Sequence, residues 1–187
     1  MLIKRGSSPR PISEYITKEK NGYNWIKISD APKYGEYITK TKEKIRPEGL
    51  AKTLLVEKGD LILSNSMSFG KPYIVNICGC IHDGWLLIRN EKNIIDTKFL
   101  SALLSTTKMF KAYKMLAAGS TVNNLNKNLI NKLNVKTPQI IEQKIISQIF
   151  EKFNFLITLH QSYWLCFFFI ISCNFLKFKN YFLAERK

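Results

Sequence analysis

Short apolar runs separated by turn residues dominate the first half of the chain. Glycine recurs between the runs, which is typical of short strands joined by tight turns. The runs that we predict as strands are residues 25–28, 54–56, 61–63, 73–77 and 85–89. The first half of the chain is therefore predicted to be mostly β-sheet.

After Asn93 the apolar residues follow the three- and four-residue steps of amphipathic helices. Asp96 is placed to cap a first helix, and Thr106 or Thr107 a second helix that closes at Gly119. The apolar faces of these two helices comprise Phe99, Leu100, Leu103, Leu104, Met109, Phe110, Tyr113 and Leu116. A short third helix is predicted at 126–132. Strands followed by helices predict an α+β fold, a small mixed-sheet domain with packed helices.

A long C-terminal helix is predicted from Thr137, with Thr137 as its cap and Pro138 at its first position. Apolar residues along it form a seam of coiled-coil type. The seam comprises Ile146, Ile149, Phe153 and Leu156. A seam of this kind contacts a partner helix or packs back on its own domain. The chain therefore divides into a domain at 1–138, a spacer or dimerisation helix at 139–161 and a tail at 162–187.

The tail is apolar and aromatic, and its longest uninterrupted apolar stretch is 163–171. A membrane-spanning helix needs about 18 to 20 apolar residues, so this stretch is short, although residues 172–174 permit an extension through Leu176. Membrane association is the alternative to a tail that covers an apolar face or is foreign to the rest of the chain.

The net charge of the chain indicates which kind of partner it could bind. The chain holds 29 Lys and Arg against 14 Asp and Glu, a formal net charge of +15, and residues 1–138 alone hold 23 of the bases and 11 of the acids. This excess fits a polyanionic partner, most commonly nucleic acid, and composition alone fits a merely solvated Lys-rich surface equally well. The 4 Cys are scattered and residues 1–10 lack a signal-peptide core, so a cytoplasmic location is expected.

Two stretches imitate a metal site and a phosphate loop. Cys78, Cys80 and His82 alternate as on one face of a strand, but one residue separates the cysteines and no fourth zinc ligand is near. The stretch 64–71 ends in Gly-Lys, but Asn65 and Pro72 occupy places where a P-loop needs Gly and Ser or Thr. Neither a metal nor a nucleotide cofactor is expected.

Asp83, Asp96 and Lys98 resemble the two acids and the lysine of a metal-dependent nuclease. Asp96 has a better role as a helix cap, and Asp83 follows a probable turn. No catalytic residues are therefore predicted, and the nuclease remains an alternative.

The remaining candidates concern recognition. Lys40, Lys42, Lys44 and Arg46 occupy every second position, so an extended chain places them on one side about 6 to 7 Å apart. This basic row suits a phosphate backbone, and a charged edge strand is its alternative. Two polar loops carry hydroxyls and amides that read base edges or serve local turns. Their candidate DNA-binding residues are Ser64, Ser66, Ser68, Lys71, Ser120, Thr121, Asn123 and Asn124.

Six stretches, read in order, resemble the specificity subunits of type I restriction-modification systems. They are RGSSPRP (5–11), WIKISD (25–30), YITKTKEKIRPEGL (37–50), KGDLILSNSMSFGKPYIV (58–75), GSTVNNLNKNLINKLNVKTP (119–138) and IEQKIISQIFEKFN (141–154). Each stretch is loose alone, but their order and spacing are specific. The resemblance covers roughly residues 3–161.

The resemblance implies a DNA target recognition domain that reads one half of a bipartite double-stranded target, followed by a spacer helix. Partner methyltransferase subunits would modify adenine, and a separate ATP-driven restriction subunit would translocate and cut DNA. The chain differs from a full-length subunit, because it begins almost at RGSSPRP, holds one recognition domain instead of two and ends in the apolar tail. We therefore expect a homodimer, pairing with a second specificity fragment, or a truncated silent allele. A membrane-associated basic protein is the further alternative.

Overall fold

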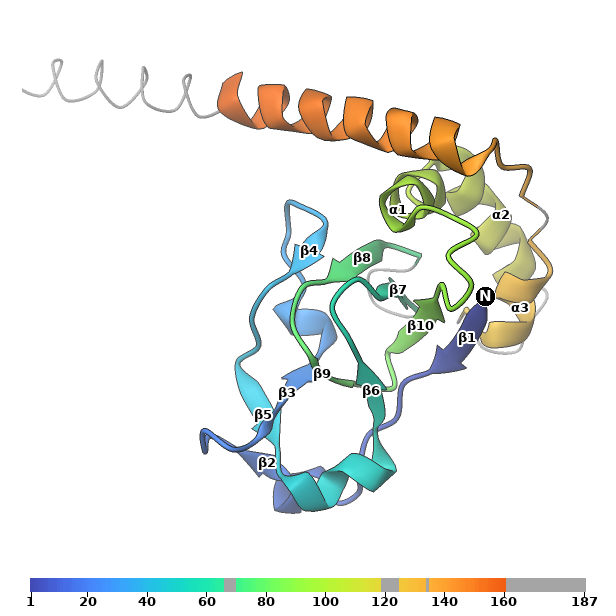
Figure 1. Ribbon diagram of the computed structural model, residues 1–187. Helices are drawn as coiled ribbons and strands as arrows, with labels where there is room; N and C mark the ends of the chain where they lie inside the picture. Colours follow the sequence, from blue (N-terminus) through green and yellow to red (C-terminus); the bar gives the residue numbers. More distant parts are fainter. Residues whose placement is uncertain (66–69, 119–124, 134, 161–187) are drawn as a thin grey trace, which may run out of the picture. The chain divides into compact units, whose positions relative to one another are not determined.

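The computed structural model describes residues 1–65, 70–118, 125–133 and 135–160. The chain divides into two compact units, Met1–Lys144 and Ile145–Lys187. The first unit contains two β-sheets and three short helices, α1 to α3 (Figure 1). A further helix spans residues 140–160.

Five strands of the described chain form the first sheet, in the spatial order β1-β10-β7-β8-β4. They are β1 (Leu2–Arg5), β10 (Trp85–Arg89), β7 (Leu61–Ser64), β8 (Pro72–Val75) and β4 (Tyr37–Ile38). β4 pairs with β8 in parallel, and the other pairs are antiparallel. All residues of β7 and β8 are buried, which explains their nearly unbroken apolar sequences.

The second sheet also has five strands among the described residues, in the order β2-β5-β3-β9-β6. They are β2 (Ile16–Thr17), β5 (Glu43–Ile45), β3 (Tyr23–Ile26), β9 (Gly79–Ile81) and β6 (Leu54–Val56). β3 pairs with β9 in parallel and the other pairs are antiparallel. β5 therefore lies inside this sheet and is not an edge strand.

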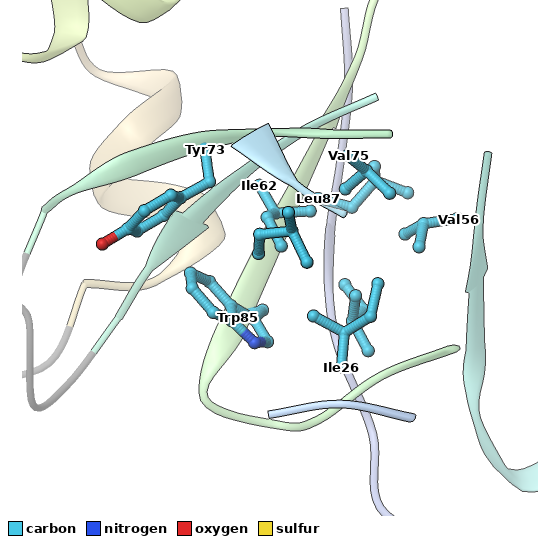
Figure 2. Packing of buried hydrophobic residues seen from close by; sticks show 9 residues of the cluster. Ile26, Val56, Ile62, Tyr73, Val75, Trp85 and Leu87 are labelled. Carbon is cyan, nitrogen blue, oxygen red and sulfur yellow. The ribbon is translucent and has the colours of Figure 1, made fainter. Parts of the chain in front are cut away.

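The two sheets share one apolar core (Figure 2). The first sheet contributes Ile38, Ile62, Tyr73, Val75, Trp85 and Leu87, and the second contributes Ile26, Val56 and Ile81. The Tyr73 and Trp85 rings meet edge to face with their centroids 5.7 Å apart. This core fixes the two sheets against each other.

The outer face of the second sheet is covered by short 3₁₀ segments. Trp25, Ile45 and Cys80 form a second buried cluster there. Ile12 and Leu50 pack against it from η1 (Ile12–Glu14) and η3 (Pro47–Lys52). A third segment, η2 (Ile28–Asp30), follows β3 directly, so the predicted strand 25–28 ends at Ile26. The centre of this sheet is therefore buried on both faces, whereas Tyr23 and Leu55 toward its margins are exposed.

Helices α1 (Thr97–Leu104), α2 (Thr107–Ala118) and α3 (Lys127–Asn131) pack beside the first sheet, where α1 contacts β8 and α3 contacts β1. Asp96 accepts a hydrogen bond from the backbone N–H of Phe99 at 2.8 Å, Thr106 from that of Met109 at 3.3 Å and Asn126 from that of Leu129 at 3.0 Å. The capping predictions for α1 and α2 are confirmed. Phe110 was predicted on the buried face of α2 but is 39% exposed.

The start of the C-terminal helix differs from the prediction. The helix begins at residue 140, so Thr137 is not its cap and Pro138 is not its first residue. The buried Gln143 side chain explains this, because its amide donates to the Pro138 carbonyl at 2.8 Å and its oxygen accepts from the Asp96 N–H at 2.9 Å. The Gln139 carbonyl then accepts the backbone N–H of Gln143 at 3.0 Å.

The α+β prediction, with a helix at the C-terminal end, is confirmed. Each of the five predicted strands overlaps an observed strand, although Ile77 lies beyond β8. The apolar pattern did not mark β1, β2, β4, β5 and β9, which have two to four residues each. Hydrophobic periodicity therefore located β3, β6, β7, β8 and β10, but not β4 and β9, which also contribute to the core.

We expect Asp96→Ala to lower the free energy of unfolding by about 1 kcal/mol, because the first turn of α1 loses its cap. Asp96→Asn retains an oxygen for the Phe99 N–H and should stay within about 0.5 kcal/mol of the parent. Urea denaturation measures both. Equal stability of the alanine variant and the parent would contradict the capping role.

Candidate nucleic-acid interface

The buried Asn65 joins three segments of the chain that lie far apart in sequence. Its side-chain amide donates to the Asp83 carbonyl at 2.9 Å, and its backbone N–H donates to the Gly84 carbonyl at 3.0 Å. Its own carbonyl accepts the Leu125 N–H at 3.2 Å. Asn65 is the last described residue before 66–69, and Leu125 is the first after 119–124. Both predicted recognition loops are therefore anchored at Asn65.

The other end of the first loop is also fixed. Gly70 has φ +74 and lies so close to the ring of Tyr113 that an added Cβ would stand 2.5 Å from that ring. The Gly70 N–H donates to the Ser64 carbonyl at 2.9 Å, and the Ser64 N–H donates to the Lys71 carbonyl at 3.0 Å. The glycine of this stretch thus serves close packing against α2 and not a phosphate loop.

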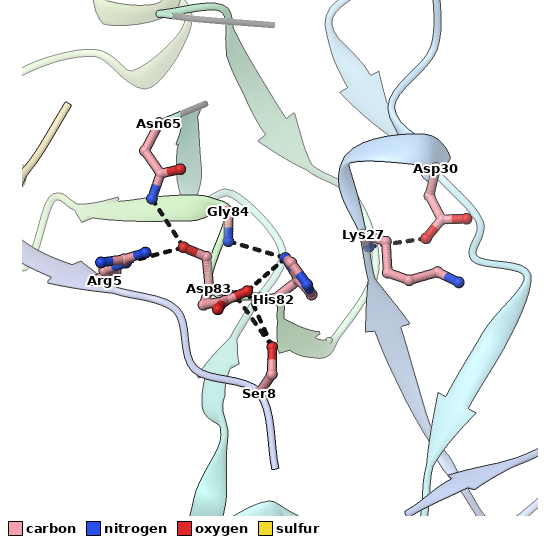
Figure 3. Close-up of polar contacts among 8 residues, drawn as sticks. All are labelled: Arg5, Ser8, Lys27, Asp30, Asn65, His82, Asp83 and Gly84. Carbon is pink, nitrogen blue, oxygen red and sulfur yellow. Dashed lines mark hydrogen bonds and ion pairs between the residues drawn. The ribbon is translucent and has the colours of Figure 1, made fainter. Parts of the chain in front are cut away.

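The turn between β9 and β10 receives the N-terminal RGSSP stretch (Figure 3). Arg5 Nε donates to the Asp83 carbonyl at 3.0 Å, and Ser8 Oγ donates to the Asp83 carboxylate at 3.2 Å. Gly6 lies against the backbone here, since an added Cβ would stand 2.2 Å from the His82 carbonyl oxygen. The RGSSP residues therefore hold in place the turn that supports Asn65.

A cationic and aromatic group follows the first loop. Lys71 Nζ lies 4.9 Å from the centre of the Tyr73 ring and donates to the Lys33 carbonyl at 3.1 Å. Lys33 Nζ lies 5.3 Å from the centre of the Tyr34 ring, and Tyr34 is 81% exposed. Neither Lys33 nor Tyr34 was a sequence candidate, because an isolated Lys-Tyr pair in a loop carries no pattern.

The structure tests the predicted loop residues only in part. Ser64 is fully buried, and its backbone bonds to Gly70 and Lys71. It therefore holds the ends of the loop together and is not exposed for contact with DNA. Lys71 is half-buried beside the loop. Ser66, Ser68, Ser120, Thr121, Asn123 and Asn124 lie outside the described residues. Asn65 and Leu125 were not among the predicted DNA-binding residues. The sequence offered only one signal for Asn65, a polar residue shortly after an apolar run, and none for Leu125.

The basic row does not form one straight strand. Lys40 and Lys42 precede β5, Lys44 lies within it and Arg46 follows it. Lys44 Nζ donates to the Lys20 carbonyl at 3.0 Å. Acids accompany the row, because Asp30 accepts the Lys42 N–H at 3.3 Å and Glu43 pairs with Lys27 at 2.8 Å. The row therefore presents a weaker positive field than its spacing alone suggests.

The cysteine and histidine residues are separated by burial. Cys78 is exposed and precedes β9, while Cys80 is buried inside it. Burial raises the pKa of the Cys80 thiol, although a hydrogen bond with Thr53 opposes the shift, so the thiolate that zinc requires is disfavoured. His82 Nδ1 lies 2.9 Å from the Asp83 carboxylate. Within the described ranges no His, Cys, Asp and Glu cluster has the make-up of a metal site.

The residues that resemble a nuclease site have structural partners. Asp96 caps α1 through its side chain, and Asp83 binds Ser8 and His82 through its carboxylate. Lys98 is exposed on α1. These contacts give both acids a role in the fold.

The C-terminal helix presents the predicted seam. Ile149, Phe153 and Leu156 are 48%, 58% and 57% exposed, and Ile146 is half-buried. No helix in the described part of the chain has the length and apolar content needed to cross a membrane. The apolar stretch 163–171 lies outside the described residues.

Comparison with known proteins identifies what the chain is similar to. A family model described as the type I restriction modification DNA specificity domain matches residues 3–163. A chain from a structure that addresses complex assembly and conformational transition of the type I R-M system aligns with a TM-score of 0.64 and 20% identity, over 84% of this chain and 36% of that chain. The HsdS subunit from Thermoanaerobacter tengcongensis aligns with a TM-score of 0.60 and 15% identity, over 84% of this chain and 36% of that subunit. These likenesses show the fold.

We expect Gly70→Ala to destabilise the domain more than Gly59→Ala. Both glycines have positive φ, +74 and +92, so each alanine costs about 1 to 2 kcal/mol of backbone strain. Nothing lies within 4 Å of an added Cβ at Gly59, whereas the Tyr113 ring blocks one at Gly70 and adds about 1 to 3 kcal/mol. Urea denaturation of the pair isolates the ring contact, and equal losses would refute it.

Proposed function

The chain belongs to the family of type I restriction-modification DNA specificity domains, and we propose that it reads one half of a bipartite double-stranded DNA target. In this proposal the chain selects the site and does not catalyse. Methyltransferase subunits modify adenine, and an ATP-driven restriction subunit translocates and cuts the DNA. The hydrogen bond between the Leu125 N–H and the Asn65 carbonyl carries the proposal, because it anchors two polar loops at one place.

The composition of the two loops supports base reading. Between Asn65 and Gly70 the sequence is SMSF, and between Ala118 and Leu125 it is GSTVNN. Hydroxyls and amides donate and accept hydrogen bonds at base edges, and Asn pairs well with adenine in the major groove. Ser66, Ser68, Ser120, Thr121, Asn123 and Asn124 are the proposed readers.

Positioning on the duplex falls to basic side chains. Phosphate contacts fix the register of a protein on DNA and carry no sequence information. Lys71, at the end of the first loop, and the basic row Lys40, Lys42, Lys44 and Arg46 are the candidates from the sequence. Lys71 has the stronger support because it follows the loop directly and donates to the carbonyl of Lys33, whose ammonium lies over the exposed Tyr34 ring.

The C-terminal helix supports a role in assembly. Apolar residues cover more of its surface than the predicted seam, since Ile145, Phe150 and Ile157 are also 52%, 53% and 54% exposed. A surface helix needs an apolar stripe of roughly 100° to pack on one neighbour, and this helix exceeds that width. We propose that it binds a second copy of the chain or a second specificity fragment, which places two readers at a fixed spacing.

Binding of the chain to duplex DNA should weaken steeply with salt. Each phosphate contact contributes about −0.9 to the slope of log K against log salt, so four contacts alone give about −3.6. Titrations across a salt series measure the slope on duplexes of random sequence. A flat response would remove the electrostatic basis of the proposal.

Variants of the loops and of the basic row should separate reading from positioning. Asn123→Ala with Asn124→Ala should reduce the ratio of specific to random affinity by about 1 to 3 kcal/mol per lost base contact. Removal of the four row side chains as alanines should weaken binding to both duplexes alike. The specific duplex is obtained by selection from a random pool with the parent chain. Row variants that bind both duplexes like the parent would leave the row as a solvated surface.

The helix prediction uses neighbouring positions as a matched pair. Ile149→Glu and Gln148→Glu each add one negative charge, and both parent residues are exposed. Only Ile149→Glu places that charge in the seam, where each buried apolar side chain contributes about 1.5 to 3 kcal/mol. Light scattering on the full chain should show a dimer that Ile149→Glu, alone or with Phe153→Glu, dissociates and Gln148→Glu retains. A symmetric homodimer would select an interrupted palindrome. A monomeric parent chain would contradict the proposed association.

A further inference from the structure

The exposed face of α2 carries three lysines, Lys108, Lys111 and Lys114. All three are exposed, as is Met115 at 79%. Their spacing of three residues keeps them on neighbouring turns of one side of the helix. The opposite side of α2 is buried, with Met109 7% and Tyr113 0% exposed. We call Lys108, Lys111 and Lys114 the α2 lysine face.

The α2 lysine face has no acidic residue near it along the chain. Residues 97–141 contain seven lysines and neither Asp nor Glu. None of the three lysines takes part in an ion pair with another described residue. The basic row, by contrast, has Asp30 and Glu43 in contact with its own segment. The α2 lysine face is therefore the less compensated of the two cationic surfaces.

Contacts of α2 place it beside the anchored loops. Tyr113 lies against Gly70, at the end of the first loop. A groove of about 490 Å³ is lined by Gly70, Lys71 and Pro72 on one side and by Leu104, Ser105, Thr107 and Phe110 on the other. Lys114 Nζ lies 4.6 Å from the centre of the Phe110 ring, so its charge stays near the rim of this groove. Lys71 adds a fourth cation there.

The dimensions of α2 match a nucleic-acid strand. Lys114 lies six positions after Lys108, a rise of about 9 Å along the helix. Successive phosphates of one strand rise about 3.4 Å along the duplex axis, so the face spans two to three phosphates. Lysine side chains reach over this range because their stems are flexible.

We propose that Lys108, Lys111 and Lys114 bind the phosphate backbone of the duplex and dock the recognition loops on it. This inference rests on the proposed DNA recognition and adds the α2 lysine face to the positioning contacts proposed for Lys71 and the basic row. Because α2 packs on Gly70 through Tyr113, a helix seated on the backbone also sets the distance of the first loop from the bases.

The test compares two triple variants of the full chain that remove the same charge. The first is Lys108→Ala, Lys111→Ala and Lys114→Ala. The control is Lys18→Ala, Lys20→Ala and Lys58→Ala, three exposed lysines in the turns after β2 and before β7. Lys58 precedes the start of β7, whereas Ser64 ends that strand near the loops. Both triples keep every buried side chain, and urea denaturation verifies equal folding.

The α2 triple should reduce the salt slope by about 2.7 and weaken binding about 100-fold at 0.1 M salt, to specific and random duplexes alike. The control triple should leave the slope within about 0.5 of the parent, since a distant charge forms no phosphate contact. Lys108→Arg, Lys111→Arg and Lys114→Arg should restore the slope, because arginine retains the charge. If the alanine triple proves unstable, Lys111→Glu alone must reproduce the direction of the effect.

An α2 triple whose slope and affinity equal those of the control overturns the inference while the parent chain still binds DNA. A parent chain that binds no duplex in a salt-dependent way refutes the proposed function itself. A slope that is reduced in the basic-row variant and unchanged in the α2 triple also overturns the inference, and leaves the positioning role with Lys40, Lys42, Lys44 and Arg46.

Discussion

A buried polar group must find hydrogen-bond partners, and Asn65 shows what this requirement does for the domain. The residue is 2% exposed, directly after a strand, and its amide and backbone groups are satisfied by Asp83, Gly84 and Leu125. An unsatisfied buried amide costs about 1 to 3 kcal/mol, so these three segments stay together. Arg5 donates to the same Asp83 carbonyl as Asn65 does, and Ser8 donates to the Asp83 carboxylate. The relation between the two loops thus follows from local hydrogen-bond satisfaction.

Much of the fold was predictable because burial leaves a direct trace in sequence. Strands such as β7 and β10 are buried on both faces and stand out as apolar runs. β2 and β4 have two residues each, too few for any period to appear. The predicted start of the C-terminal helix was wrong. A hydrogen bond between Gln143 and Asp96, 47 residues apart, outweighs the preference of Thr137 for a capping position. Local propensity has no access to such a contact.

The candidate site was predictable by composition but not by geometry. Polar loops and excess lysine are visible in the sequence, and they led to the loops at Ser64–Ser68 and Ser120–Asn124 and to the basic row. The anchor at Asn65, the ring of Tyr113 under Gly70 and the groove beside α2 each join residues distant in sequence. The α2 lysines had a signal, the acid-free stretch 97–141, which whole-domain charge conceals.

The anchors of the two loops are mostly main-chain contacts, between Asn65 and Leu125, Ser64 and Gly70, and Ser64 and Lys71. Main-chain groups are the same in every residue, so such contacts tolerate any side chain in the intervening loop. The described anchor contacts therefore do not depend on the side chains at 66–69 or 119–124. In the proposed function, new target preferences would therefore arise by changes in the loops, while the scaffold that holds their ends stays the same.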